Sequence, residues 1–193
     1  MSNSPKLFII SGCNGAGKTT AATTILPEVL GCRHFVNADE IAKGLSPLDP
    51  DAVQFLAGRI MLRRIAALMK RHETFAIETT LSTRSYASLV RRARAQGYDV
   101  ELLYVWLESV DAARMRVARR VAEGGHNIPP EVIERRYTMG LKNLFDVFMP
   151  IVDFWTVVDN SRGRLEIVAS SRRVENQSTF TKIKEKYDRS RNG

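Results

Sequence analysis

The sequence predicts an α/β fold in three layers, with a parallel central sheet of about five strands and helices on both faces. Short apolar runs rich in β-formers alternate with helical patterns along the chain, which is typical of a parallel sheet. A glycine-rich stretch lies between the first apolar run and the first helical one. Arginines are concentrated at about residues 109–137, where we expect an Arg-rich helical lid.

The expected strands are short runs of β-branched, aromatic and leucine residues bounded by turn residues. In chain order they are residues 6–11, 33–37, 74–79, 99–107 and 154–159, and residues 164–170 are a candidate edge strand.

The segment 51–71 has the spacing of an amphipathic helix that covers the sheet. Its predicted apolar face consists of Val53, Leu56, Ile60, Met61, Ile65 and Leu68. The next helical segment ends at Gly97, a typical residue after a helix C-terminus, and the prolines at 129–130 suit the start of another helix.

Composition favours one globular domain. A chain of 193 residues with 44% hydrophobic content can bury a core of its own, so we expect a single domain over residues 1–193. A polar C-terminal tail is expected at about residues 185–193. Cys13 and Cys32 lack the spacing of zinc sites or disulfide frameworks, and the first apolar run is too short for a signal sequence or a membrane span. We therefore expect a cytoplasmic protein without a membrane partner.

The formal net charge of +8 favours anionic partners. Nucleotides, sugar phosphates, nucleic acid and an acidic protein all fit this charge, and the charge alone does not distinguish among them.

Residues 12–19, GCNGAGKT, match the phosphate-loop motif G-x-x-x-x-G-K-[ST] in full, between a strand and a helix. Such glycines let backbone N–H groups and the positive end of the following helix face phosphates. We therefore expect a P-loop NTPase-type fold that binds a nucleoside triphosphate. Lys18 is expected to contact the β- and γ-phosphates and Thr19 to bind Mg²⁺. The expected nucleotide-binding set is Gly12, Asn14, Gly15, Ala16, Gly17, Lys18, Thr19 and Thr20.

Asp39 and Glu40 follow the second expected strand, at the edge of the sheet where ligands bind in open α/β folds. A carboxylate there can accept the proton of a hydroxyl that attacks the γ-phosphate. The alternative is an N-cap, because an acidic residue that opens a short helix needs no catalytic role. The position alone does not separate the two interpretations.

Glu78 ends the third expected strand, where many P-loop proteins have an aspartate. It is a candidate ligand of Mg²⁺ through water, or a residue that binds the acceptor hydroxyl. Thr79 and Thr80 are candidates to hydrogen-bond the acceptor, and β-propensity with helix capping explains them equally well.

The lid region contains six arginines, of which at least two are expected to be surface charge only. An arginine that closes over the phosphates would stabilise charge on the transferred group. Arg116 and Arg120 share a helix face because they are four residues apart. The remaining lid arginines are Arg114, Arg119, Arg135 and Arg136.

The ordered set GCNGAGKTT, FVNADEIA, IETTLSTRSY and RVARRVAEGGHNIPPEVIERRY resembles the zeta-toxin family of P-loop kinases over about residues 6–160. Members of that family use ATP or GTP to phosphorylate a UDP-N-acetylamino sugar, typically UDP-N-acetylglucosamine on the 3′-hydroxyl of the sugar. The resemblance therefore implies a UDP-N-acetylglucosamine kinase-like phosphotransferase that uses Mg²⁺. It also implies an antitoxin protein as a candidate partner.

Carried over by position, the family's base falls on Asp39 and its phosphate lysine on Lys18. The acceptor is expected to contact Asp39, Glu40, Glu78, Thr80 and Arg84, and the metal Thr19 and Glu78. The lid arginines fall on Arg120 and on Arg135 or Arg136, with Arg116 beside them, and Arg120 is the expected catalytic one. The sequence departs from some members by reading ETT where they have a central glycine, and it is shorter than the plasmid-borne toxins.

Two other functions fit parts of the sequence. A related kinase could phosphorylate a nucleic-acid 5′-hydroxyl or an antibiotic-like alcohol. A nucleic-acid partner is not expected, because no basic stretch interleaved with aromatic residues is present. A non-enzymatic, nucleotide-dependent switch is the other alternative. No guanine-selective N-K-x-D stretch supports a GTPase, and the choice between ATP and GTP stays open.

Overall fold

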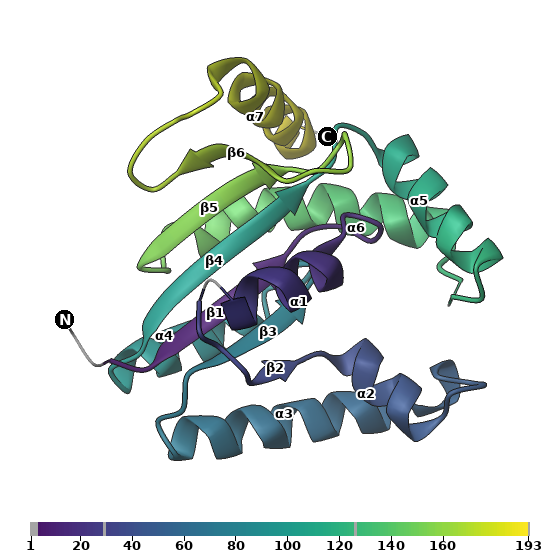
Figure 1. Cartoon of the computed structure of the whole chain (residues 1–193). Helices are drawn as coiled ribbons and strands as arrows, with labels where there is room; N and C mark the ends of the chain where they lie inside the picture. The colour runs from purple at the N-terminus through teal and green to yellow at the C-terminus, as the bar shows by residue number, and fades with distance from the viewer. Residues whose placement is uncertain (1–3, 29, 126, 193) are drawn as a thin grey trace.

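A twisted six-stranded sheet lies between helices in the computed structural model, which describes residues 4–28, 30–125 and 127–192 (Figure 1). The strand order is β2-β3-β1-β4-β5-β6, with β1 to β5 parallel and β6 antiparallel at one edge. The strands are β1 Lys6–Ser11, β2 Phe35–Val36, β3 Phe75–Thr79, β4 Asp99–Trp106, β5 Phe154–Asp159 and β6 Glu166–Ser170. The predicted α/β fold of the P-loop NTPase type, with its edge strand, is confirmed.

The helices follow the strands in the alternation that the sequence predicts. They are α1 Lys18–Glu28, α2 Ala38–Leu45, α3 Gln54–Lys70, α4 Tyr86–Ala95, α5 Val110–Ala122, α6 Pro130–Asn143 and α7 Gln177–Asn192. A 3-10 turn at Asp51–Val53 precedes α3, and a π-helical segment at Leu144–Phe148 follows α6.

Side chains alternate between the two faces of the central strand β1, as the period of a strand requires. Leu7 and Ile9 belong to the large core beneath α3, α4, α6 and α7. Phe8 and Ile10 pack on the opposite face against α1. Figure 1 shows α1 in front of the sheet with α4 and α6 behind it. Both faces of the parallel sheet are therefore covered, and the carboxyl ends of its strands point toward the glycine-rich loop.

The apolar face of α3 differs in part from the prediction. The buried residues are Ala57, Met61, Ile65, Leu68 and Met69, whereas Leu56 is exposed and Ile60 is half-buried. Val53 lies in the 3-10 turn ahead of the helix. The reason is geometric: the row that starts at Ala57 and continues in steps of four and three faces the sheet. Leu56 and Ile60 each come one residue before a member of this row and so lie to its side.

The last helix, α7, includes residues 185–192, where the sequence predicts a polar tail. It packs on the π-helical segment, with the Phe180 and Tyr187 rings 6.4 and 4.7 Å from the ring of Phe145. These aromatic contacts explain why a polar sequence continues as a helix. Among the described residues, no helix combines the length and apolarity needed to cross a membrane.

Candidate active site

The glycine-rich loop joins β1 to α1 and has a positive φ, which favours glycine, at Gly12, Gly15 and Gly17. Gly12 has a φ of 139°, and a Cβ there would lie 2.2 Å from the carbonyl oxygen of Val105 on β4. Gly15 has a φ of 75°, and its Cβ would lie 2.8 Å from the carbonyl oxygen of Ala113 on α5. The loop is thus pressed against two neighbouring elements, with a conformation that suits phosphate binding.

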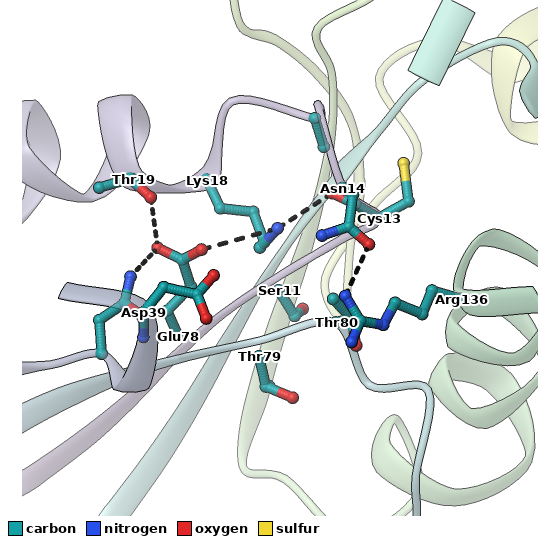
Figure 2. A network of polar contacts seen from close by, with 12 residues as sticks. Ser11, Cys13, Asn14, Lys18, Thr19, Asp39, Glu78, Thr79, Thr80 and Arg136 are labelled. Carbon is teal, nitrogen blue, oxygen red and sulfur yellow. Dashed lines mark hydrogen bonds and ion pairs between the residues drawn. The ribbon is translucent and has the colours of Figure 1, made fainter. Parts of the chain in front are cut away.

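Lys18 is the first residue of α1 and is only 7% exposed. Its Nζ donates to the carbonyl oxygen of Cys13 at 3.0 Å and lies 3.6 Å from Oε1 of Glu78 (Figure 2). The ammonium group is therefore held inside the curve of the loop, where its charge can act on an anion.

Glu78 connects three elements at the carboxyl end of β3. Besides the ion pair with Lys18, its Oε2 accepts hydrogen bonds from Thr19 Oγ1 at 2.7 Å and from Asn37 Nδ2 at 2.9 Å. The parallel pairing of Ile10 with Glu78 brings the carboxylate beside the loop. The sequence-predicted residues Lys18, Thr19 and Glu78 are thus brought together, and Asn37 joins them without having been predicted.

Asn37 is the N-cap of α2. Its Oδ1 accepts from the backbone N–H groups of Asp39 at 2.8 Å and Glu40 at 3.4 Å. The alternative interpretation of Asp39 as an N-cap is therefore wrong, because Asp39 is the second residue inside the helix. The sequence carried a usable signal, since asparagine caps helices as well as aspartate does. Its second contact, to Glu78, comes from a residue far away in the chain.

Asp39 is exposed, and within the described part of the chain no group hydrogen-bonds its carboxylate. Figure 2 shows Asp39 and Arg136 extending toward each other from α2 and α6. Arg136 Nη1 donates to Oδ1 of Asn14 in the loop at 3.2 Å. Burial lowers the pKa of Arg136, and the nearby charge of Asp39 opposes that shift. A carboxylate and a guanidinium therefore face each other beside the phosphate loop.

The other lid arginines occupy different surroundings. Arg116 Nη2 donates to the carbonyl oxygens of Asn160 at 2.6 Å and Ser161 at 3.1 Å, just after β5. Arg120, in the last turn of α5, and Arg135 on α6 are exposed. Arg136 therefore contacts the phosphate loop, whereas Arg116 contacts the segment after β5.

The remaining predicted acceptor residues are spread around the site. Glu40 forms an ion pair of 2.7 Å with Lys43, away from the Lys18 and Glu78 cluster. The Thr80 hydroxyl lies 2.9 Å from that of Ser82, and the exposed Arg84 donates Nε to Asn143 at 3.4 Å. Thr20 is exposed on α1.

The Thr19 hydroxyl and the Glu78 carboxylate supply neutral and anionic oxygens, which is the donor chemistry that Mg²⁺ prefers. The described residues contain no group of three or more His, Cys, Asp or Glu side chains placed to hold a metal. The residues present therefore fit a magnesium ion whose other ligands come from phosphates and water.

A family model described as AAA domain matches residues 7–138, which are more than half of the chain. The chain belongs to the AAA domain family. An uncharacterized protein from Haemophilus influenzae is 30% identical to this chain over 132 residues, which are 68% of this chain and 92% of the relative. Residues 7–138, which the family model matches, contain the phosphate loop, Asp39, Glu78 and Arg136.

Two solved structures share the fold of this AAA-domain chain. One comes from the PezAT chromosomal toxin–antitoxin system of Streptococcus pneumoniae, with a TM-score of 0.71 and 17% identity over 99% of this chain and 86% of that chain. The other is the AvrRxo1-ORF1:-ORF2 complex with ATP, with a TM-score of 0.73 and 21% identity over 93% of this chain. This AAA-domain chain spans 63% of the length of that second structure. Both structures share the P-loop NTPase-type fold that the sequence motifs predict.

Proposed function

We propose that this protein is a kinase that transfers the γ-phosphate of ATP or GTP to a hydroxyl of a UDP-N-acetylamino sugar. The proposed acceptor atom is the 3′-hydroxyl of the sugar in UDP-N-acetylglucosamine. The observation that carries the proposal is the placement of Asp39. Asn37 takes over the capping of α2, and the Asp39 carboxylate faces Arg136 beside the phosphate loop.

Asp39 is the proposed general base. It accepts the proton of the acceptor hydroxyl while that oxygen forms a bond to the γ-phosphorus. The bond from this phosphorus to the oxygen that bridges it to the β-phosphate breaks, and the nucleoside diphosphate leaves with the electron pair. A carboxylate without a competing hydrogen bond is suited to take this proton.

Lys18 and Arg136 supply the positive charge that this transfer requires. Lys18 lies within the loop that would hold the β- and γ-phosphates, and Arg136 reaches the same loop from α6. Positive groups held in place stabilise charge that spreads over the transferred phosphoryl group without having to reorganise. We assign Arg136 to this role together with the exposed Arg120, which would act from the end of α5.

Thr19 and Glu78 would hold magnesium, which neutralises phosphate charge when it is bound. Glu78 has only 10% of its side chain exposed and already accepts the hydroxyl of Thr19, so its oxygens need little rearrangement to take part. Thr80 and Arg84 are the proposed acceptor contacts on the loop after β3.

The similar structures support parts of this proposal. The AvrRxo1-ORF1:-ORF2 complex was solved with ATP, which supports a nucleoside triphosphate as the donor. The PezAT system pairs a toxin with an antitoxin, which supports an antitoxin-like protein as a partner of this chain. The UDP-sugar itself is supported by the sequence resemblance to zeta toxins.

The test is phosphate transfer from labelled ATP or GTP to UDP-N-acetylglucosamine, with parallel reactions on a 5′-hydroxyl oligonucleotide and without an acceptor. We expect a phosphorylated UDP-sugar in the first reaction only. Transfer to the oligonucleotide alone would make the protein a nucleic-acid kinase. Nucleotide binding without transfer to any acceptor would support the nucleotide-dependent switch.

A further inference from the structure

Asn143, the last residue of α6, is a fully buried polar residue that the proposed chemistry does not use. Its Nδ2 donates to the carbonyl oxygen of Leu81 at 2.7 Å, and its Oδ1 accepts from Nε of Arg84 at 3.4 Å. Both partners belong to the loop that follows β3, which we call the acceptor loop (residues 79–84). Asparagine is a poor residue for a helix interior, and here both ends of its amide are used outside the helix.

The acceptor loop has an unusual backbone that needs such support. Leu81 has a φ of 54°, in the left-handed region that is costly for a residue with a branched, bulky side chain. Its side chain is fully buried in the main core, and its N–H donates to Thr79 Oγ1 at 3.1 Å. The core, the Thr79 hydroxyl and the Asn143 amide therefore hold this residue from three sides.

One face of α6 contacts both parts of the candidate site. Arg136, Gly140 and Asn143 are spaced by four and three residues, so they lie along the same face of the helix. Arg136 hydrogen-bonds Asn14 of the phosphate loop. A Cβ on Gly140 would lie 2.5 Å from the carbonyl oxygen of Thr80, so the helix backbone lies directly against the acceptor loop. The π-helical segment begins immediately after Asn143, and such segments are frequent at functional sites.

We propose that Asn143 is a positioning residue for the acceptor. It fixes the acceptor loop to α6, so that Thr80 and Arg84 are held at a set distance from the phosphate loop. The inference rests on the proposed function for the identity of the acceptor. The mechanical part, that Asn143 holds the loop, depends only on the contacts described.

The variant Asn143→Asp tests it with little change in shape. Aspartate keeps an oxygen for Arg84 but places a second oxygen against the carbonyl of Leu81, where the donor is lost. The control is Tyr98→Phe. Tyr98 directly precedes β4, at the end of the sheet away from the phosphate loop, and its buried hydroxyl donates to the carbonyls of Leu68 and Glu73. Both variants lose buried hydrogen bonds, so both should lower the melting temperature, and the loss of stability alone does not separate them.

We expect Asn143→Asp to raise the KM for UDP-N-acetylglucosamine by about tenfold or more while the KM for the nucleotide stays within about twofold. Hydrogen–deuterium exchange in a peptide covering residues 79–85 should be about tenfold faster, with exchange in residues 12–19 unchanged. Tyr98→Phe should change neither KM nor the exchange of either peptide. Unchanged exchange in the acceptor loop, or equal rises in both KM values, would overturn the inference.

The two proposals can fail separately. If the wild-type protein phosphorylates no UDP-sugar, the proposed function fails, and exchange alone decides whether Asn143 holds the loop. If Asn143→Asp does not fold, Asn143→Ala is judged by the same criteria. This variant removes both hydrogen bonds of the amide without burying a charge.

Discussion

Asn37 Nδ2 donates a hydrogen bond of 2.9 Å to Oε2 of Glu78 and so ties the start of α2 to the carboxyl end of β3. The other end of the same amide caps α2 through the N–H groups of Asp39 and Glu40. One side chain therefore sets how Asp39 lies relative to Glu78. Because Asn37 caps the helix, the carboxylates of Asp39 and Glu78 can have separate proposed roles.

Replacing Asn37 with aspartate should separate its two contacts. Aspartate caps a helix as well as asparagine does, but it puts a second carboxylate against Glu78. We expect the free energy of unfolding at pH 7 to fall by about 1–3 kcal/mol, and the deficit to shrink at pH 5, where one of the two acids binds a proton. Urea unfolding at both pH values measures this. Ser109→Asp at the N-cap of α5 is the control and should be within about 0.5 kcal/mol of wild type.

Asp39→Asn should lower sugar phosphorylation by about 10²–10⁴-fold because it removes basicity and keeps the shape. Nucleotide binding should survive. Asp111→Asn is a matched control, since Asp111 is also the second residue of a helix that another side chain caps, and it should have normal activity. Rates of transfer to UDP-N-acetylglucosamine are compared once thermal melts have shown that the proteins are equally folded. Equal rates for wild type and Asp39→Asn would remove Asp39 from the mechanism.

Lys18→Ala should abolish phosphate transfer, because the charge inside the loop is lost. The fold should persist, since Thr19 and Asn37 still donate to Glu78. Circular dichroism with a thermal melt checks the fold, and labelled phosphate checks transfer. Lys43→Ala, which removes an exposed ion pair, should behave like wild type. Near-normal transfer by Lys18→Ala would contradict the assignment of the phosphate loop.

Arg136→Ala and Arg120→Ala should lower kcat far more than they weaken nucleotide binding, because both arginines are assigned to the transferred group. The expected loss is about 10²-fold or more for Arg136, within the range of arginine contacts in phosphoryl transfer. Arg119→Ala, which breaks an exposed pair with Glu123, is the control. Normal turnover with weakened nucleotide binding in either variant would instead identify a phosphate clamp in the ground state.

The pH dependence of stability should carry a contribution from Cys13. Burial raises the pKa of this thiol to about 11 from 9.0, with the Lys18 charge opposing the shift. Between these values the folded protein keeps the proton that the unfolded chain loses, so the free energy of unfolding falls as the pH rises. Relative to Cys13→Ala, wild type should lose on the order of 2 kcal/mol between pH 9 and 11. Urea unfolding of both proteins across this range measures the difference, and parallel curves would contradict the prediction.

The fold could be predicted because its strands are short apolar runs that differ clearly from the amphipathic helices between them. The glycines at 12, 15 and 17 were informative for a different reason: the backbone has a positive φ there, which other residues rarely adopt. The face of α3 was harder to predict. Leu56 and Ile60 are as apolar as Met61, and only the angle at which the helix meets the sheet selects the buried row.

The candidate site was predictable where one motif fixes the geometry and less so where distant segments meet. Lys18, Thr19 and Glu78 follow from the phosphate loop and from the end of a strand. The contact between Asn37 and Glu78 joins residues 41 positions apart, and no local pattern reports it. The arginine at the loop could not be chosen from sequence either, because Arg136 reaches Asn14 only through the path of α6 over the sheet.

The central position of β1 has a consequence for the order in which the chain is made. Leu7 pairs with Phe75 of β3 and Lys6 with Asp99 of β4, so β1 can pair only after segments about 70 and 90 residues later in the chain have been made. The phosphate loop is synthesised before the Val105 carbonyl against which Gly12 packs, with about 90 residues between them. A nascent chain that ends before β4 therefore carries the complete phosphate-loop motif without the surface that shapes it, and it gains its nucleotide site only after β4 has been synthesised.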